Sequence, residues 1–68
     1  MNSVQVSVAE ADTYLTVAEV ATRLKISRWK VYELIRSREL DSFLLGRCRR
    51  IPANSVAELV ARLLHEVA

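Results

Sequence analysis

Hydrophobic residues first recur at helical spacing just after residue 16. The apolar positions of this run lie three and four residues apart, as on one buried face of a helix: Val17, Val20, Ala21 and Leu24. Thr16 and Glu19 have the spacing of a capping box, in which each side chain bonds the other residue's backbone amide. We therefore predict a helix that begins after Thr16 and ends near Lys25.

A second helix is predicted to follow after a very short turn at Ile26-Ser27. Ser27 is a suitable N-cap, because its hydroxyl can accept a hydrogen bond from a free amide of the first turn. The inner face holds apolar residues, namely Val31, Leu34 and Ile35. The remaining positions fall mostly on the outer face: Arg28, Trp29, Lys30, Tyr32, Glu33 and Arg36. The pattern therefore predicts two short helices joined by a tight turn. The outer face of the second helix carries basic and aromatic side chains.

A β-hairpin is predicted next. Ser42–Leu45 forms the first strand and Cys48–Ile51 the second, with Gly46, the chain's one glycine, free to adopt the positive φ of the turn. We expect Pro52 to stop the second strand, because proline has no amide to donate. A lone hairpin is marginal in water, so it must pack on the helices. We expect it to do so through Phe43, Leu45 and Ile51.

A third helix closes the pattern. Asn54 and Ser55 are both candidate N-caps, and Ser55 with Glu58 repeats the capping-box spacing. An amphipathic stripe follows, made of Val56, Leu59, Val60, Leu63, Leu64 and Val67. The predicted core draws on every element: Leu15, Val17, Val20, Leu24, Ile26, Val31, Leu34, Ile35, Leu40, Phe43, Ile51, Val56, Leu59, Val60 and Leu63.

The element order defines the fold class and the domain. We predict a flexible tail over residues 1–13, although the alternation of Val4, Val6 and Val8 also fits an edge strand. Residues 14–68 then form one domain, mainly α with a small two-stranded β wing, in the order helix, turn, helix, hairpin, helix. This is a winged helix-turn-helix.

Charge is unevenly distributed along the chain. Residues 23–50 hold nine of the ten basic residues and three of the eight acidic ones, for a net charge of +6, while residues 1–22 carry −3 and residues 51–68 carry −1. A basic centre between acidic flanks is typical of a surface that faces phosphates. A solvated face of mixed charge is the alternative interpretation.

Length and composition exclude several classes of protein. Sixty-eight residues give a thin core and no room for an enzyme cleft with its supporting residues. A single cysteine, Cys48, permits no internal disulfide and fits a reducing cytoplasm. We find no membrane span, signal peptide, metal-ligand cluster, cofactor motif or catalytic set, and His65 is interpreted as a surface residue. We expect a cytoplasmic, non-enzymatic protein without a cofactor.

An ordered set of short motifs resembles the excisionase family of winged helix-turn-helix domains, within the wider group similar to the MerR DNA-binding head. The motifs are Leu15-Thr16-Val17-Ala18-Glu19-Val20-Ala21, Leu24, Ile26-Ser27-Arg28, Val31-Tyr32, Leu34-Ile35-Arg36, Leu45-Gly46-Arg47 and Arg50-Ile51-Pro52. The resemblance implies a protein that binds repeated sites beside an attachment site, bends the DNA and helps an integrase excise a mobile element. Similar domains also act as small transcriptional regulators. An interaction adaptor without a DNA role is a third possibility.

The chain departs from the family pattern at several positions. Arg38 stands where such proteins often have glycine after the second helix, so we expect that helix end to differ. The wing strands differ from the family pattern at three positions. A polar or basic residue is common at the position of Leu44, and a basic and an aromatic residue are frequent at those of Cys48 and Arg49. We therefore expect the wing to pack, or to reach DNA, somewhat differently.

The second helix is the candidate reader of the major groove, where each base pair has a distinct donor and acceptor pattern. Its N-terminal residues Ser27, Arg28, Trp29 and Lys30 are expected to meet base edges. Arg28 can bind guanine O6 and N7 together, and Lys30 can bind guanine or a phosphate. Tyr32 and Arg36 are expected to contact the backbone. Trp29 is expected to pack against a sugar or thymine methyl, to cover part of the wing, or to pack on Ile26 or the Glu33 stem.

The wing supplies the second set of candidate contacts. A narrow minor groove attracts inserted arginine, and Arg47 at the hairpin tip is the best placed. If Ile51 points inward, Arg49 leans the same way and Arg50 faces outward to a phosphate. Thr16 either presents its helix N-terminus to a phosphate or acts as a plain cap.

Double-stranded DNA is thus the expected partner, with an integrase and further copies of the chain as additional ones. One such domain reads only a few base pairs, so several copies or a partner are needed. Leu44, Leu64 and Val67 are apolar beyond the needs of the core, and we expect them to help such docking.

Overall fold

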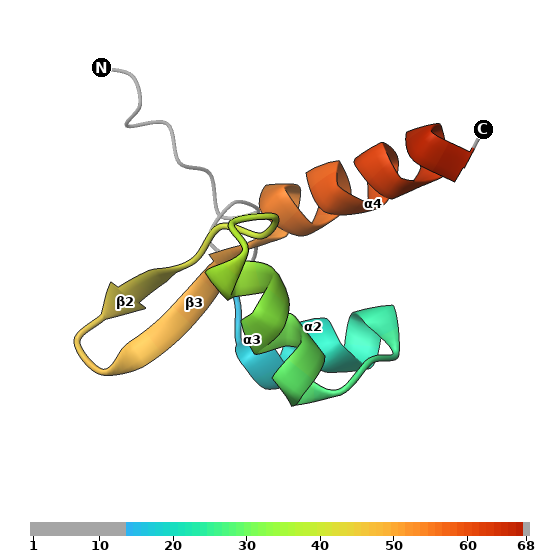
Figure 1. The fold of residues 1–68 in the computed structure, drawn as a ribbon. Helices are drawn as coiled ribbons and strands as arrows, with labels where there is room; N and C mark the ends of the chain where they lie inside the picture. The colour runs from blue at the N-terminus through green and yellow to red at the C-terminus, as the bar shows by residue number, and fades with distance from the viewer. Residues whose placement is uncertain (1–13, 68) are drawn as a thin grey trace, which may run out of the picture.

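The computed structural model describes residues 14–67 and contains three helices and a small antiparallel sheet (Figure 1). In chain order the elements are β1 (Tyr14–Leu15), α2 (Val17–Leu24), α3 (Arg28–Arg36), β2 (Phe43–Leu45), β3 (Cys48–Pro52) and α4 (Ala53–Val67). The predicted fold class and all three helices are confirmed. The predicted tail, residues 1–13, lies outside the described part of the chain.

Helix α2 begins and ends as its sequence predicts. The amide of Glu19 donates to Thr16 Oγ1 over 3.0 Å, and the amide of Thr16 donates to Glu19 Oε1 over 2.8 Å. At the other end Lys25 has a left-handed φ of 58°, and the amide of Ile26 donates back to the carbonyl of Ala21. This reversal leads directly into α3 and keeps the turn between the helices short.

Helix α3 is capped at both ends. Ser27 Oγ accepts from the amide of Lys30 over 3.1 Å, which confirms Ser27 as the N-cap. Beyond the helix Arg38 has a φ of 65°, its amide donates to the carbonyl of Ile35, and the amide of Glu39 donates to that of Leu34. These two bonds form a Schellman motif, whose left-handed position usually holds glycine. The expectation of a different helix end is therefore wrong, because Arg38 adopts the backbone conformation that glycine would.

The sheet has three strands, in the order β1-β3-β2, and not the two predicted. Leu15 pairs with Ile51 and Tyr14 with Pro52, so β3 continues through Pro52. Proline is compatible with a strand end because the ladder needs no amide from it there. Gly46 makes the hairpin turn with a φ of 67°, as predicted.

The core lies where α2, β3 and α4 meet. Its buried apolar residues come from every element except β2: Leu15, Val17, Val20, Ala21, Val31, Leu40, Ile51, Val56 and Leu59. Three predicted packing residues are exposed, Phe43 by 40%, Leu45 by 66% and Leu63 by 46%. Phe43 pairs with Arg50, on the face of the sheet opposite to Ile51, and the hairpin projects beyond the helices (Figure 1). Of the three hairpin residues, only Ile51 anchors the wing.

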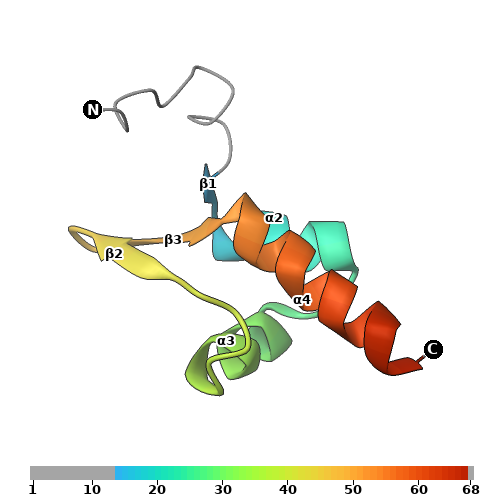
Figure 2. The same ribbon diagram turned by 90° about the horizontal axis from the view of Figure 1, so that it is seen from above.

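Helix α4 begins at Ala53, one to two residues before the predicted caps. Ser55 is therefore inside the helix and is buried, with 5% of its surface exposed. Its Oγ accepts a hydrogen bond of 2.9 Å from the amide of Asp41, so it ties α4 to the segment before β2. The helix then runs away from the sheet, on the side opposite to the hairpin (Figures 1 and 2).

Candidate nucleic-acid interface

Four of the predicted contact residues share one exposed face of α3. Successive residues are rotated by about 100°, so Arg28, Trp29, Tyr32 and Arg36 fall within about 100° of one another. All four are exposed, whereas Val31, which lies outside this arc, is fully buried. Trp29 is 64% exposed, so most of its indole surface is free for contact with another molecule. The sequence therefore presents two arginines and two aromatic rings together on one side of the helix.

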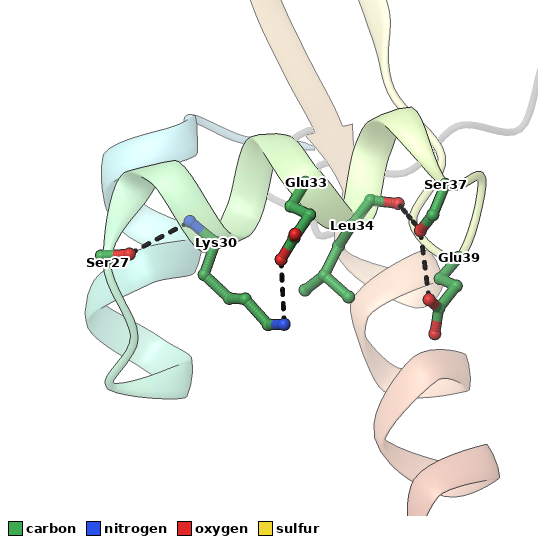
Figure 3. Close-up of polar contacts among 6 residues, drawn as sticks. All are labelled: Ser27, Lys30, Glu33, Leu34, Ser37 and Glu39. Carbon is green, nitrogen blue, oxygen red and sulfur yellow. Dashed lines mark hydrogen bonds and ion pairs between the residues drawn. The ribbon is translucent and has the colours of Figure 1, made fainter.

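Lys30 lies on a different flank of α3. Its Nζ forms an ion pair of 3.0 Å with Glu33 Oε1, on the side of the helix where Leu34 lies (Figure 3). There it borders an apolar groove between α3 and α4 that includes Leu59 and Leu63. Helical rotation places Lys30 about 100° or more from Trp29 and Tyr32. Lys30 is thus separated from the shared face, and Glu33 competes for its charge.

The two N-cap residues have local partners in the structure. Both the amide and the hydroxyl of Thr16 are engaged by Glu19, which is the arrangement of a plain cap. Ser27 is exposed, and its Oγ is already bonded to the amide of Lys30. The start of α3, which carries the positive end of the helix dipole, lies at the surface beside Arg28.

The three arginines of the wing point in different directions. Arg47 follows Gly46 at the exposed tip of the hairpin. Arg49 lies on the same face of β3 as Ile51, and its Nη1 donates to Ser42 Oγ at the base of the wing. Arg50 lies on the other face, paired with Phe43, and its Nη1 donates to the carbonyl of Arg49 over 2.9 Å. Alternation along β3 thus places Arg49 and Arg50 on opposite faces of the sheet, and both are half-buried.

The sequence does not predict a polar groove that lies between the end of α3 and the segment before β2. It has a volume of about 350 Å³ and is lined by Ile35, Arg36, Arg38, Leu40, Asp41 and Ser42. Arg49 reaches its rim through Ser42. The groove lies beside Arg36, on the exposed face of α3, and extends to Ser42, the residue before β2. The one sequence signal for it is Arg38, at a position where glycine was expected.

Other kinds of site find no support in residues 14–67. No group of three or more histidine, cysteine, aspartate or glutamate side chains in this range could hold a metal ion. None of the helices described is long and apolar enough to span a membrane. Cys48 is exposed and unpaired with any described cysteine.

Comparison with known proteins identifies relatives with the same pattern. Residues 14–63 match a family described as a helix-turn-helix domain. An excisionase of Streptomyces ambofaciens is 46% identical over 52 residues, which cover 76% of this chain and 84% of that protein. A protein of Saccharopolyspora erythraea named "Probable excisionase" is 44% identical over 50 residues, which cover 74% of this chain but 51% of that protein.

A third relative, from Mycobacterium tuberculosis, is described as a DNA-binding protein. It is 39% identical over 46 residues, which cover 68% of this chain and 59% of the relative. No solved structure matches the chain. The matched region includes α2, α3 and the wing, which carry the exposed arginine and aromatic side chains.

Proposed function

Because this chain belongs to the excisionase family of helix-turn-helix DNA-binding proteins, we propose that it bends double-stranded DNA beside an attachment site and thereby promotes excision of a mobile element by an integrase. The observation that carries this proposal is the exposed basic and aromatic face of α3 together with the β2–β3 hairpin, which projects beyond the helices (Figure 1). A helix and a hairpin on one surface can enter two neighbouring grooves of a duplex. The role is architectural and not catalytic.

Helix α3 enters the major groove with its N-terminal turn first. Arg28 is exposed there and can donate two hydrogen bonds to guanine, which is worth about 1–3 kcal/mol of discrimination against other bases. Trp29 and Tyr32 cover the sugars or thymine methyl groups beside it, and Arg36 binds the backbone. Lys30 contributes only if DNA displaces Glu33 from its ammonium.

The wing enters the adjacent minor groove. Arg47 at its tip reaches furthest from the helices, and a narrow minor groove has a strongly negative potential that favours an inserted guanidinium. Arg50 binds a phosphate on the outer face of the wing, and Arg49 supports the base through Ser42. Contact in both grooves stabilises a bent duplex, because bending brings more of the backbone to the protein.

Partners on DNA would dock through apolar side chains that the core does not use. Leu44 is 58% exposed on the wing and Leu64 is 67% exposed on α4. The wing and α4 extend to opposite sides of the molecule (Figure 1). Such an arrangement suits contact between copies bound at repeated sites, or with the integrase, in the cytoplasm. The side chain of Val67, the third predicted docking residue, lies outside the described side chains.

The first experiment compares two variants that lose the same charge. Arg28→Ala removes a side chain of the exposed α3 face, whereas Arg62→Ala removes one from α4, where Nη2 donates to the carbonyl of Glu39. Mobility-shift titration should show that Arg28→Ala binds the preferred site more weakly and distinguishes it less from other duplexes. Arg62→Ala should keep the parent's preference between sequences. Equal preference in both variants would refute the docking of α3.

The second experiment separates excision from transcriptional control. Circular-permutation analysis of the bound duplex should reveal a bend, and the chain should stimulate excision by an integrase encoded beside it. Footprints should cover repeated sites near an attachment site. A footprint over a promoter alone, with an unbent duplex and no effect on excision, would instead establish a transcriptional regulator.

A further inference from the structure

Arg38 is an unexpected residue for the backbone conformation that it adopts. Its φ of 65° is the left-handed region, which disfavours every residue with a Cβ relative to glycine. The two hydrogen bonds of the Schellman motif come from the amides of Arg38 and Glu39, and neither needs the arginine side chain. Glycine would thus complete the same helix end with less strain. The arginine side chain does not contribute to this local structure, so its role lies in the surface around it.

Arg38 lines the polar groove between the end of α3 and the segment before β2, and it is exposed. Arg36 lines the same groove, and Arg49 reaches Ser42 at its rim. Asp41 is the acidic residue in the lining, so the groove and its rim keep an excess of positive charge. Among the described residues, no ion pair involves Arg38, and it is exposed. An anion that enters the groove therefore meets a guanidinium without a competing carboxylate bound to it.

The geometry of a duplex determines which anion reaches this position. Neighbouring major and minor grooves are separated by one sugar-phosphate backbone. If α3 occupies the major groove and the wing the adjacent minor groove, that backbone passes between them, beside the segment from Arg38 to Ser42 that leads from α3 to the wing. We propose that this groove is a phosphate-binding site of the DNA complex and that Arg38 is its principal ligand. The inference rests on the proposed binding in two grooves. It adds a contact to the backbone of the DNA strand that lies between α3 and the wing.

Two glycine substitutions provide a matched test. Arg38→Gly and Lys25→Gly each remove one positive charge, and each relieves a left-handed residue at a helix end, at φ 65° and φ 58° respectively. Both should raise Tm by a few degrees, because glycine accepts this conformation without a Cβ clash. The expected difference is in DNA binding, which only Arg38→Gly should weaken. Arg38→Lys restores the charge and should recover most of the affinity.

The measurement is the salt dependence of binding to a mixed-sequence duplex. One lost phosphate contact lowers the slope of log K against log salt by about 0.9, so the affinity ratio of parent to Arg38→Gly should shrink about eightfold over a tenfold rise in salt. Lys25→Gly should keep the parent slope. An unchanged slope for Arg38→Gly, or an equal loss in both variants, would overturn the phosphate site. A parent protein with no salt-dependent DNA binding would instead refute the proposed function itself.

Discussion

The Ser55→Ala substitution removes a buried hydroxyl that joins α4 to the segment between α3 and β2. Ser55 is 5% exposed, and its Oγ accepts from the amide of Asp41 over 2.9 Å. The two residues are 14 positions apart in the chain, so the bond closes a tertiary contact. In the variant the Asp41 amide loses its acceptor, and the surrounding packing prevents water from fully replacing the hydroxyl oxygen.

The expected loss of stability follows from that unsatisfied amide. A buried donor without a partner costs about 1–3 kcal/mol, and the partial exposure of this bond places the cost in the lower half of that range. Alanine offsets up to about 0.5 kcal/mol through its higher helix propensity. The net decrease in the free energy of unfolding is therefore about 1 kcal/mol. For a domain of this size it lowers Tm by roughly 4–8 °C.

Thermal and urea unfolding, followed by circular dichroism, measure this change. Ser37→Ala is the control, because Ser37 Oγ donates to the carbonyl of Leu34 over 3.1 Å in an exposed position. Water can replace that bond, so the control should stay within about 0.5 kcal/mol of the parent. If Ser55→Ala is no less stable than Ser37→Ala, the hydroxyl of Ser55 does not hold α4 in place and the reasoning is refuted.

Three further substitutions test the caps, the wing and the exposed face of α3. Thr16→Ala should lower the free energy of unfolding by about 1 kcal/mol in urea titration, and a loss below about 0.3 kcal/mol would contradict the capping box. Gly46→Ala should lower the free energy of unfolding by about 1 kcal/mol through backbone strain alone, because an added Cβ meets no atom within 4 Å. If thermal unfolding shows a loss above about 3 kcal/mol, the added Cβ contacts another atom after all. Trp29→Ala should weaken DNA binding in mobility shifts yet leave Tm unchanged, whereas a clear fall in Tm would mean that the indole packs on the protein.

The parts of the fold that were predicted correctly depend on interactions close in sequence. Thr16 with Glu19, and Ser27 with the amide of Lys30, each connect residues three apart, so their spacing in the sequence already defines the helix starts. Gly46 likewise defines the hairpin turn by itself. Local chemistry of this kind needs no knowledge of the tertiary structure.

The errors concern contacts between distant segments. Tyr14–Leu15 is too short to show an alternating pattern, and it is a strand only because β3 offers it an edge at Ile51 and Pro52. Phe43 was placed in the core because it is large and apolar. Its pairing with Arg50 instead puts it on the outer face, where its ring meets Tyr14 edge to face with centroids 5.7 Å apart. Ser55 was interpreted as a cap because its distant partner, Asp41, could not be known.

The candidate interface shows the same division. Helical rotation alone grouped most of the outer residues of α3, and strand alternation sorted Arg49 from Arg50. The ion pair of Lys30 with Glu33 was within reach of the sequence, since the two residues are three apart on a helix. The polar groove was not, because it forms only when the segment from Arg38 to Ser42 folds against the end of α3.

The division between core and surface explains how this small domain separates folding from recognition. Helix α3 contributes Val31 to the fully buried core and β2 contributes no buried residue. The side chains proposed to meet DNA are therefore held by caps, by the Schellman motif and by the Arg49 bond to Ser42, while α2, β3 and α4 supply most of the buried surface. Substitution of an exposed arginine or aromatic residue in α3 thus removes little buried area. If this face meets DNA as proposed, such a substitution changes the DNA sequence that is bound without a comparable loss in the free energy of unfolding.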